Sequence, residues 1–358
     1  MTQPVDSINR RRTQEEDPPA TPPVAPAVRE VDVDALTHGT FDYGTLALSA
    51  VPVAPPPSPT QLAQSKLDTY RAAFDGPYVV DGSRVSASPQ FRMAGGFNDK
   101  AAGYSRGPNG GEIDGKNPQV KELRAICAPT GVSPQHALMG APTARELVTV
   151  TQALITAGKL PSGPGDVQTR IKDMQWKYGI GIDCTDYVIG AAMKANGKSW
   201  SDVSIVVGKF TLPVPGTDYF GTADSNPHLS RVTASNAKTG DVFCLDSPQP
   251  GEVGHRAVAY SNEACDAKRC NELGAKYGAS ATDFLKGGPV HEIQVDASWG
   301  AMDTGEAFGG VRRDTWFYNE SSHEWAELNV RNSTKTPSFE VTSNGPAGEN
   351  LHGVYRFR

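Results

Sequence analysis

Apolar and polar residues alternate along several runs in the second half of the chain, and the alternation predicts β-strands. The runs cover residues 254–260, 290–298, 313–318 and 353–358, and a period of two is typical of strands with one buried face. A further strand is predicted over residues 239–245. A loop containing Pro and Gly separates it from 254–260, so these two runs predict a hairpin.

Helical periodicity is clearest before this region. Residues 143–157 begin with Thr143 as N-cap and carry Glu146 three positions later, which is the capping-box pattern. An apolar stripe follows at helical spacing: Leu147, Val150 and Leu154. Further helices are predicted over residues 60–74 and 185–194. Together with the strands, they predict an α+β fold in which helices pack on an antiparallel sheet.

The first part of the chain has a different composition. Residues 1–60 contain two Pro-rich runs and bury too little apolar surface to offset the entropy of ordering, so a disordered tail is predicted. Residues 88–115 are rich in Gly, Asn and Ser, which indicates a long loop. We therefore divide the chain into a tail (1–60), a poorly defined prefix (61–120) and one larger domain (121–358).

Charge and composition limit the classes of function. The 358 residues are 38% hydrophobic and carry a formal charge of -6, which argues against a nucleic-acid partner. The sequence contains no segment long and apolar enough to span a membrane. No apolar segment of a signal peptide follows the basic residues 10–12, so synthesis in the cytoplasm is expected.

One cysteine has the setting of a nucleophile. Cys184 lies between a Gly-rich approach (residues 178–183) and the helix predicted over 185–194. Unpaired N–H groups and the helix dipole at a helix N-terminus favour the thiolate, which is the attacking form of cysteine. The alternative is a buried cysteine that packs as a small apolar residue.

A candidate base follows about seventy residues later. His255 lies at the start of the second predicted strand of the hairpin, next to Gly254. The next predicted strand supplies candidate groups to orient its ring. Alternation places Glu292, Gln294, Asp296 and Ser298 on one face of that strand and His291 on the other. Asp296 is preferred because a carboxylate stabilises an imidazolium, while Ser298, Glu292 and His291 remain open.

These stretches resemble the NlpC-type cell-wall cysteine peptidases, a papain-like family. That family has a motif like Asp-Cys-Ser-Gly-Phe-Val at the start of a helix, then a strand beginning with a motif like Pro-Gly-Asp, then Gly-His and a polar third residue. The matching stretches here are residues 183–188, 239–243, 254–255 and 295–298. The resemblance covers about residues 165–358. Asp186 stands where the family usually has Gly, and the interval to His255, including residues 212–216, is long.

The resemblance implies hydrolysis of an amide bond in the peptide stem of peptidoglycan. Cys184 would attack the carbonyl, His255 would move the proton and Asp296 would orient His255. The backbone N–H of Cys184 would contribute to an oxyanion hole. Substrate would meet Asp183, Tyr178, Asp186 and Ser298. Simpler roles are open for Asp183 as a helix N-cap and for Tyr178 as a packed aromatic residue.

Two other classes of function remain open. One is different papain-like acyl chemistry on proteins, such as that of a deamidase, transglutaminase or acyltransferase, because the same Cys-His pair serves all of these. The other is a catalytically inactive binding module. A wall-cleaving enzyme without an export signal also needs a route to its substrate. A phage particle or a specialised secretion or contractile apparatus, contacted directly or through a chaperone by residues 1–60, would provide one.

The remaining cysteines predict no cofactor. Cys127 and Cys244 are expected to be buried. Cys265 and Cys270 are separated by four residues in a charged segment and would form a small disulfide in an oxidising compartment. No second ligand pair has the spacing of a zinc site, so no metal is expected.

Overall fold

The structure is a computed structural model of the whole chain. It describes residues 56–92, 118–163, 165–207, 210–212, 219–247, 254–299, 310–329 and 338–358. The tail predicted over residues 1–60 lies outside the described residues up to position 55, and the loop predicted over 88–115 lies outside them from position 93. Most of the insertion noted at 212–216 also lies outside them.

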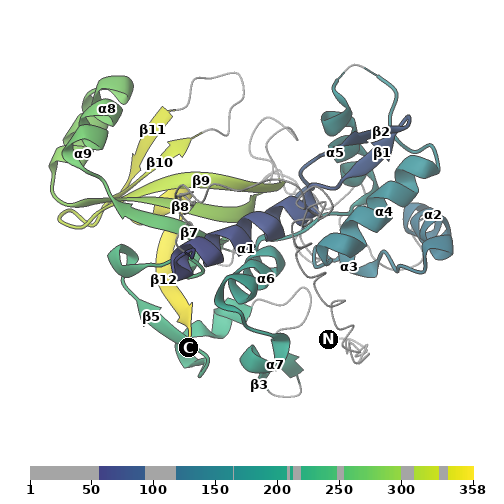
Figure 1. Cartoon of the computed structure of the whole chain (residues 1–358), viewed down its shortest axis with the longest axis horizontal. Coiled ribbons are helices and arrows are strands. Elements are labelled where there is room, and N and C mark those ends of the chain that lie inside the picture. The colour runs from purple at the N-terminus through teal and green to yellow at the C-terminus, as the bar shows by residue number, and fades with distance from the viewer. Residues whose placement is uncertain are drawn as a thin grey trace, which may run out of the picture. The chain divides into compact units, whose positions relative to one another are not determined.

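Helices form most of the first half of the described chain (Figure 1). Their bounds are α1 Pro59–Phe74, α2 Pro118–Cys127, α3 Gln135–Leu138, α4 Ala144–Thr156, α5 Val167–Tyr178, α6 Cys184–Asn196, α7 Trp200–Val203, α8 Ala267–Tyr277 and α9 Ala279–Lys286. Short 3-10 turns lie at Ala128–Thr130, Tyr219–Ser225, Ala234–Asn236 and Pro346–Gly348. The capping box predicted for α4 is confirmed, because Thr143 and Glu146 exchange the expected bonds.

Strands form three antiparallel sheets among the described residues. Two hairpins stand apart, β1 Tyr78–Val80 with β2 Ser83–Val85, and β3 Ile205–Val207 with β4 Phe210–Leu212. The main sheet has eight strands in the order β11-β10-β9-β8-β7-β6-β12-β5. Their bounds are β5 Leu229–Val232, β6 Val242–Asp246, β7 Arg256–Ala264, β8 Val290–Trp299, β9 Gly310–Asn319, β10 Trp325–Asn329, β11 Ser338–Thr342 and β12 Asn350–Phe357.

The predicted hairpin is present in the main sheet. Strands β6 and β7 pair antiparallel, with Val242 opposite Val258, and β8 pairs with β7 on the other side. The last strand, β12, is not at an edge but lies between β6 and β5. The mixed helical and antiparallel architecture expected from the sequence is therefore confirmed.

Each face of the main sheet contributes to its own core. Val242, Cys244 and Val258 join the helices in one apolar cluster that includes much of α6. Their neighbours in the alternation, Phe243 and Ala257 among them, join the Trp side chains of β8, β9 and β10 in a second cluster. The sheet therefore has a face toward α6 and a face toward the tryptophans, and successive residues of a strand alternate between the two faces.

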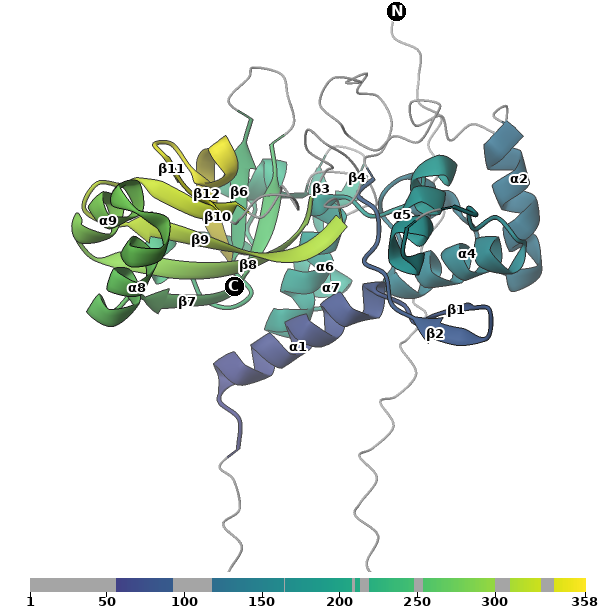
Figure 2. The same cartoon turned by 90° about the horizontal axis from the view of Figure 1, so that it is seen from above.

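Helix α1 belongs to the same compact unit as the sheet. The unit extends from Pro56 to the C-terminus, so it includes the segment that the sequence analysis set apart as a prefix. Figures 1 and 2 show α1 next to α6, and the two helices are in contact. Leu67 and Phe74 of α1 are fully buried in the core that contains α6, so α1 is part of the layer that covers the sheet.

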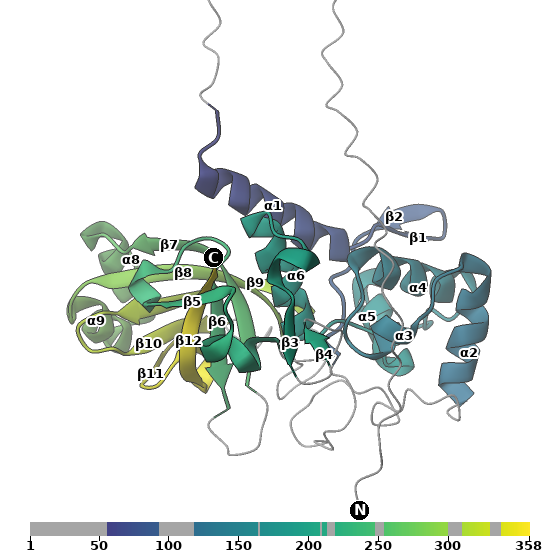
Figure 3. The same ribbon diagram turned by 90° about the horizontal axis from the view of Figure 1, so that it is seen from below.

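The remaining helices of the first half lie on the other side of α6. Figure 3 shows α2, α4 and α5 grouped there, with the sheet opposite them. Their buried apolar side chains, such as Leu123, Leu154 and Met174, continue the core of α6. Helix α6 is therefore central, and its N-terminus is held by both layers.

Candidate active site

Cys184 is the first residue of α6, and Asp183 is the N-cap of that helix. The Asp183 carboxylate accepts a hydrogen bond of 2.7 Å from the backbone N–H of Asp186, so the N-cap role left open for Asp183 is confirmed. The sulfur is buried, with 7% of the residue exposed. An N-terminal position on a 13-residue helix stabilises a thiolate through the helix dipole.

The segment before Cys184 is held by an isolated β-bridge. Ile182 bridges in parallel to Phe91, and its N–H donates to the carbonyl of Gln90 at 3.1 Å. A Cβ on Gly181 would lie 2.1 Å from the Gln90 oxygen, so only glycine allows this approach. The Ser298 hydroxyl donates to the Ile182 carbonyl at 2.8 Å, which ties the segment to the end of β8.

His255 lies at the start of β7 and is 6% exposed. It exchanges two backbone hydrogen bonds with Leu245, of 2.9 and 3.0 Å. Residues paired in this way have their side chains on the same face, and Leu245 belongs to the core of the tryptophan face. The imidazole stacks on Trp299, with ring centroids 3.7 Å apart and an angle of 22°.

The structure brings the segments of Cys184 and His255 to one end of the main sheet. Ser298 holds the residue two before Cys184, and its neighbour Trp299 holds the ring of His255. The two side chains approach this end differently, however. Helix α6 covers one face, and His255 extends from the other. A reaction between them therefore has to take place across the end of the sheet.

Asp296 is not brought to His255, and its expected role as orienting group is corrected. Asp296 lies opposite Val258 in the ladder, on the face toward α6. Its two oxygens accept hydrogen bonds of 2.7 and 2.9 Å from Arg313, which also donates to Asp68 of α1 at 2.9 Å. Burial raises the pKa of Asp296, and Arg313 opposes that rise. The carboxylate thus anchors α1 to the sheet.

The other expected site residues divide into two groups. Ser298 and Asp186 lie at the N-terminus of α6, where Ser298 is fully buried as a donor to Ile182. Tyr178 lies elsewhere, because its hydroxyl donates to Glu122 of α2 at 3.0 Å and its ring is in the core. It is therefore a packed aromatic residue. Burial and the Glu122 carboxylate raise the pKa of Tyr178 to about 12.

The two further alternatives for the orienting group lie toward the opposite end of β8. Glu292 accepts two hydrogen bonds, of 2.7 and 2.8 Å, from Arg269 of α8. The Nδ1 atom of His291 lies 3.0 Å from the side-chain oxygen of Asn262. Both residues are separated from Trp299 by most of the ten-residue strand, so neither reaches the ring of His255.

Three residues that continue from His255 along this face of the sheet were not predicted from the sequence. Trp299 stacks on His255, and the guanidinium carbon of Arg312 lies 5.3 Å from the centre of the Trp299 ring. Arg312 is paired in turn with Asp314 at 3.0 Å. The register places Trp299 opposite Gly310, with Arg312 and Asp314 following on the same face. Residues 310, 312 and 314 occupy alternate positions of a strand, so the sequence alone could have placed Arg312 and Asp314 on one face.

Cys127 and Cys244 are fully buried, as expected. In the part of the chain that the structure describes, no three His, Cys, Asp or Glu side chains are grouped to hold a metal ion. Within the same residues, no helix combines the length and the apolarity needed to cross a membrane.

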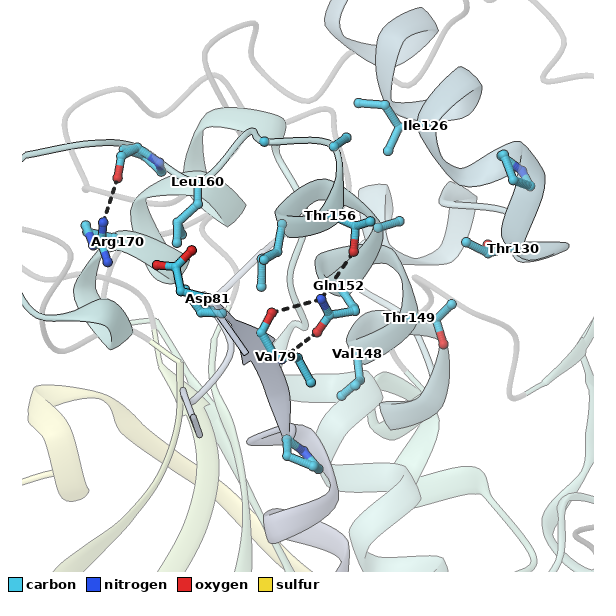
Figure 4. Close-up of a pocket in the computed structure, with 18 of the residues that line it drawn as sticks. Val79, Asp81, Ile126, Thr130, Val148, Thr149, Gln152, Thr156, Leu160 and Arg170 are labelled. Atoms are coloured by element: carbon cyan, nitrogen blue, oxygen red, sulfur yellow. Dashed lines mark hydrogen bonds between the residues drawn. The ribbon is translucent and has the colours of Figure 1, made fainter. Parts of the chain in front are cut away.

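A cavity of about 1150 Å³ opens away from Cys184, between the β1–β2 hairpin, α2 and α4 (Figure 4). Apolar side chains such as Ile126 and Leu160 line much of it. The Gln152 amide spans one wall, where it accepts from the N–H of Val79 at 2.7 Å and donates to the carbonyl of Val79 at 3.1 Å. Neither Cys184 nor His255 lines this cavity, so it is separate from the candidate active site.

Comparison with known proteins adds no assignment: no family model, curated protein or solved structure matches the chain.

Proposed function

We propose that the protein is a cysteine hydrolase that cleaves an amide bond in the peptide stem of peptidoglycan. Cys184 is the nucleophile and His255 is the base that takes the thiol proton and returns it to the leaving amine. The backbone N–H of Cys184 contributes to the oxyanion hole, because a helix start is an expected location for such donors. The fold is proposed to be papain-like.

The position of Cys184 carries this proposal. It combines a helix N-terminus, a preceding segment fixed on both sides, and a link through Ser298 and Trp299 to the strand end that bears His255. The positioning of His255 falls to Trp299 in this proposal, in place of a carboxylate. Stacking fixes the plane of the imidazole, and the ring can still gain and lose a proton during the reaction.

Mass spectrometry of purified peptidoglycan after incubation with the protein tests the proposal. We expect stem-peptide fragments with the wild type and a loss of roughly a thousandfold or more in their rate of release with Cys184→Ala. His255→Ala is expected to cause a loss of the same order. The matched control is Cys127→Ala, which removes a fully buried thiol from α2 and should leave the rate within a fewfold of wild type.

A thiol-reactive probe separates failure of the substrate from failure of the nucleophile. Rapid labelling of Cys184 near neutral pH, without fragments from several wall chemotypes, would retain the nucleophile and move the substrate to proteins or acyl conjugates. Labelling no faster than that of an ordinary thiol would refute the proposal.

A binding module without catalysis is the second candidate. It is favoured by the ring of His255, which lies on the face of the sheet opposite α6. In that case wild type and Cys184→Ala would sediment equally with insoluble peptidoglycan, and neither would release fragments. If the protein is an enzyme, the wild type releases fragments and Cys184→Ala does not.

A further inference from the structure

Two cysteine sulfurs lie in contact at the end of β7 opposite to His255. Cys265 directly follows β7, and Cys270 is the fourth residue of α8. Their Sγ atoms are 2.8 Å apart. Both residues are half-buried, whereas Cys127, Cys184 and Cys244 are buried. This pair is therefore the accessible thiol pair of the chain.

Regular structure holds both cysteines in place. The N–H of Cys265 donates to the carbonyl of Val290 at 2.7 Å, and the N–H of Cys270 donates to the carbonyl of Asp266 at 2.9 Å. The Asp266 carboxylate caps α8 by accepting from the N–H of Arg269 at 2.7 Å. A disulfide bond is about 2.0 Å long, so the two sulfurs need to approach by about 0.8 Å.

We propose that Cys265 and Cys270 form a reversible disulfide when the protein meets a low-molecular-weight disulfide such as oxidised glutathione. This site is independent of the proposed hydrolase activity. The bond joins the end of β7 to the first turns of α8. It thereby adds a covalent link to the apolar cluster in which α8 and α9 pack on the main sheet, which includes Leu273, Phe284 and Phe317.

Cys270 is the sulfur that reacts first. It is the fourth residue of an 11-residue helix and directly follows Arg269. Burial raises the pKa of Cys265 to about 12, and the contact with the Cys270 sulfur adds to the rise, so the Cys265 thiol is protonated at neutral pH.

The exchange then takes place in two steps. The Cys270 thiolate attacks one sulfur of the oxidant, whose S–S bond breaks and releases one thiolate. Cys265 loses its proton to solvent and attacks the Cys270 sulfur, which releases the second thiolate. The two protein thiols lose two electrons, and the small disulfide gains them as two thiols.

Peptide mapping of the folded, full-length protein tests this inference. The protein is incubated with oxidised glutathione, its remaining thiols are alkylated, and it is digested with trypsin. Trypsin cuts after Lys268 and Arg269, between the two cysteines, so the disulfide joins two separate peptides. We expect the linked pair in the oxidised wild type, and its loss after dithiothreitol or in Cys270→Ser.

Cys184→Ser is the matched control, because it removes the candidate nucleophile and should form the linked pair as fully as the wild type. This outcome also separates the inference from the hydrolase proposal. Alkylation of both Cys265 and Cys270 in the oxidised wild type would overturn it, as would a stable glutathione adduct on Cys270 without the link.

Discussion

The side chains of several residues near α6 are oriented by hydrogen bonds to residues from other elements. Ser298 is oriented by the Ile182 carbonyl, and Asp296 by the guanidinium of Arg313. Arg313 also lies over the ring of Tyr260, with its guanidinium carbon 3.2 Å from the ring centre. Cation–π contact and bidentate pairing both favour arginine over lysine here.

Replacement of Arg313 by methionine should strongly destabilise the protein. Asp296 is fully buried, and loss of the Arg313 guanidinium that pairs with it would leave a buried charge uncompensated, which costs about 3–5 kcal/mol of unfolding free energy. Urea denaturation at neutral pH measures it. Lys159→Ala, which breaks the partly exposed pair with Glu122, is the control and should cost about 1 kcal/mol or less. Equal losses in the two variants would contradict the assigned role of Arg313.

Replacement of Gly181 by alanine should distort the approach to Cys184. The added methyl group would lie 2.1 Å from the Gln90 oxygen and 2.9 Å from the Cβ of Arg92, so the backbone has to shift, at a cost of about 1–3 kcal/mol. The probe-labelling rate of Cys184 should change with it. Gly131→Ala, whose methyl group meets nothing within 4 Å, should lower stability through its positive φ alone and leave that rate unchanged.

The ends of some helices are stabilised by local interactions that can be recognised in the sequence. Helix α4 starts at a capping box in which Thr143 and Glu146 bond each other's backbone N–H groups. Glu146 also lies 2.8 Å from Nδ1 of His136 in α3. Burial would raise the pKa of Glu146, but the bonds from His136 and Thr143 outweigh it and lower the pKa to about 2.

The free energy of unfolding should therefore decrease in acid, and protonation of Glu146 should cause part of this decrease. Its folded pKa is below the ordinary value of about 4.3, so its contribution is present above that value and is lost as pH falls toward about 2. Urea denaturation at pH values from about 2 to about 7 measures this loss. The unfolding free energy of Glu146→Gln should decrease less with falling pH than that of the wild type. A parallel decrease in the two proteins would assign the acid sensitivity to other groups.

At the scale of the whole molecule, α1 connects the first described residues to the sheet. Asp68 of α1 accepts from Arg313 of β9 and from the Tyr260 hydroxyl of β7. Phe74 packs edge-on against Tyr187 of α6, with ring centroids 5.7 Å apart. These contacts join residues far apart in the sequence, so the unit that folds should begin with α1.

Truncation tests this boundary. A chain that begins at Pro56 should keep the melting temperature of the full chain, because the compact unit begins there. A chain that begins after Phe74 would expose the core around Tyr187 and leave Arg313 without Asp68, and it should fail to give a cooperative thermal transition. Equal melting curves for the two truncated chains would refute the proposed boundary.

The sequence by itself determined the elements and much of their order. Period-two alternation identified β7, β8 and the neighbouring strands, and the capping pattern located α4 within one residue. The Gly-rich approach also placed Cys184 at a helix start. These features depend on interactions within a few residues along the chain, namely caps, turns and the alternation of faces, so the local sequence contains them.

Only the tertiary structure decided which side chains meet. Alternation showed that Asp296 and Ser298 share a face, but only the register of β7 and β8 showed that His255 faces the other way, toward Trp299. The partner of Asp296 is Arg313 of β9, which also donates to Asp68 of α1. Such pairings depend on strand register and helix packing, which long-range burial determines and local sequence does not encode.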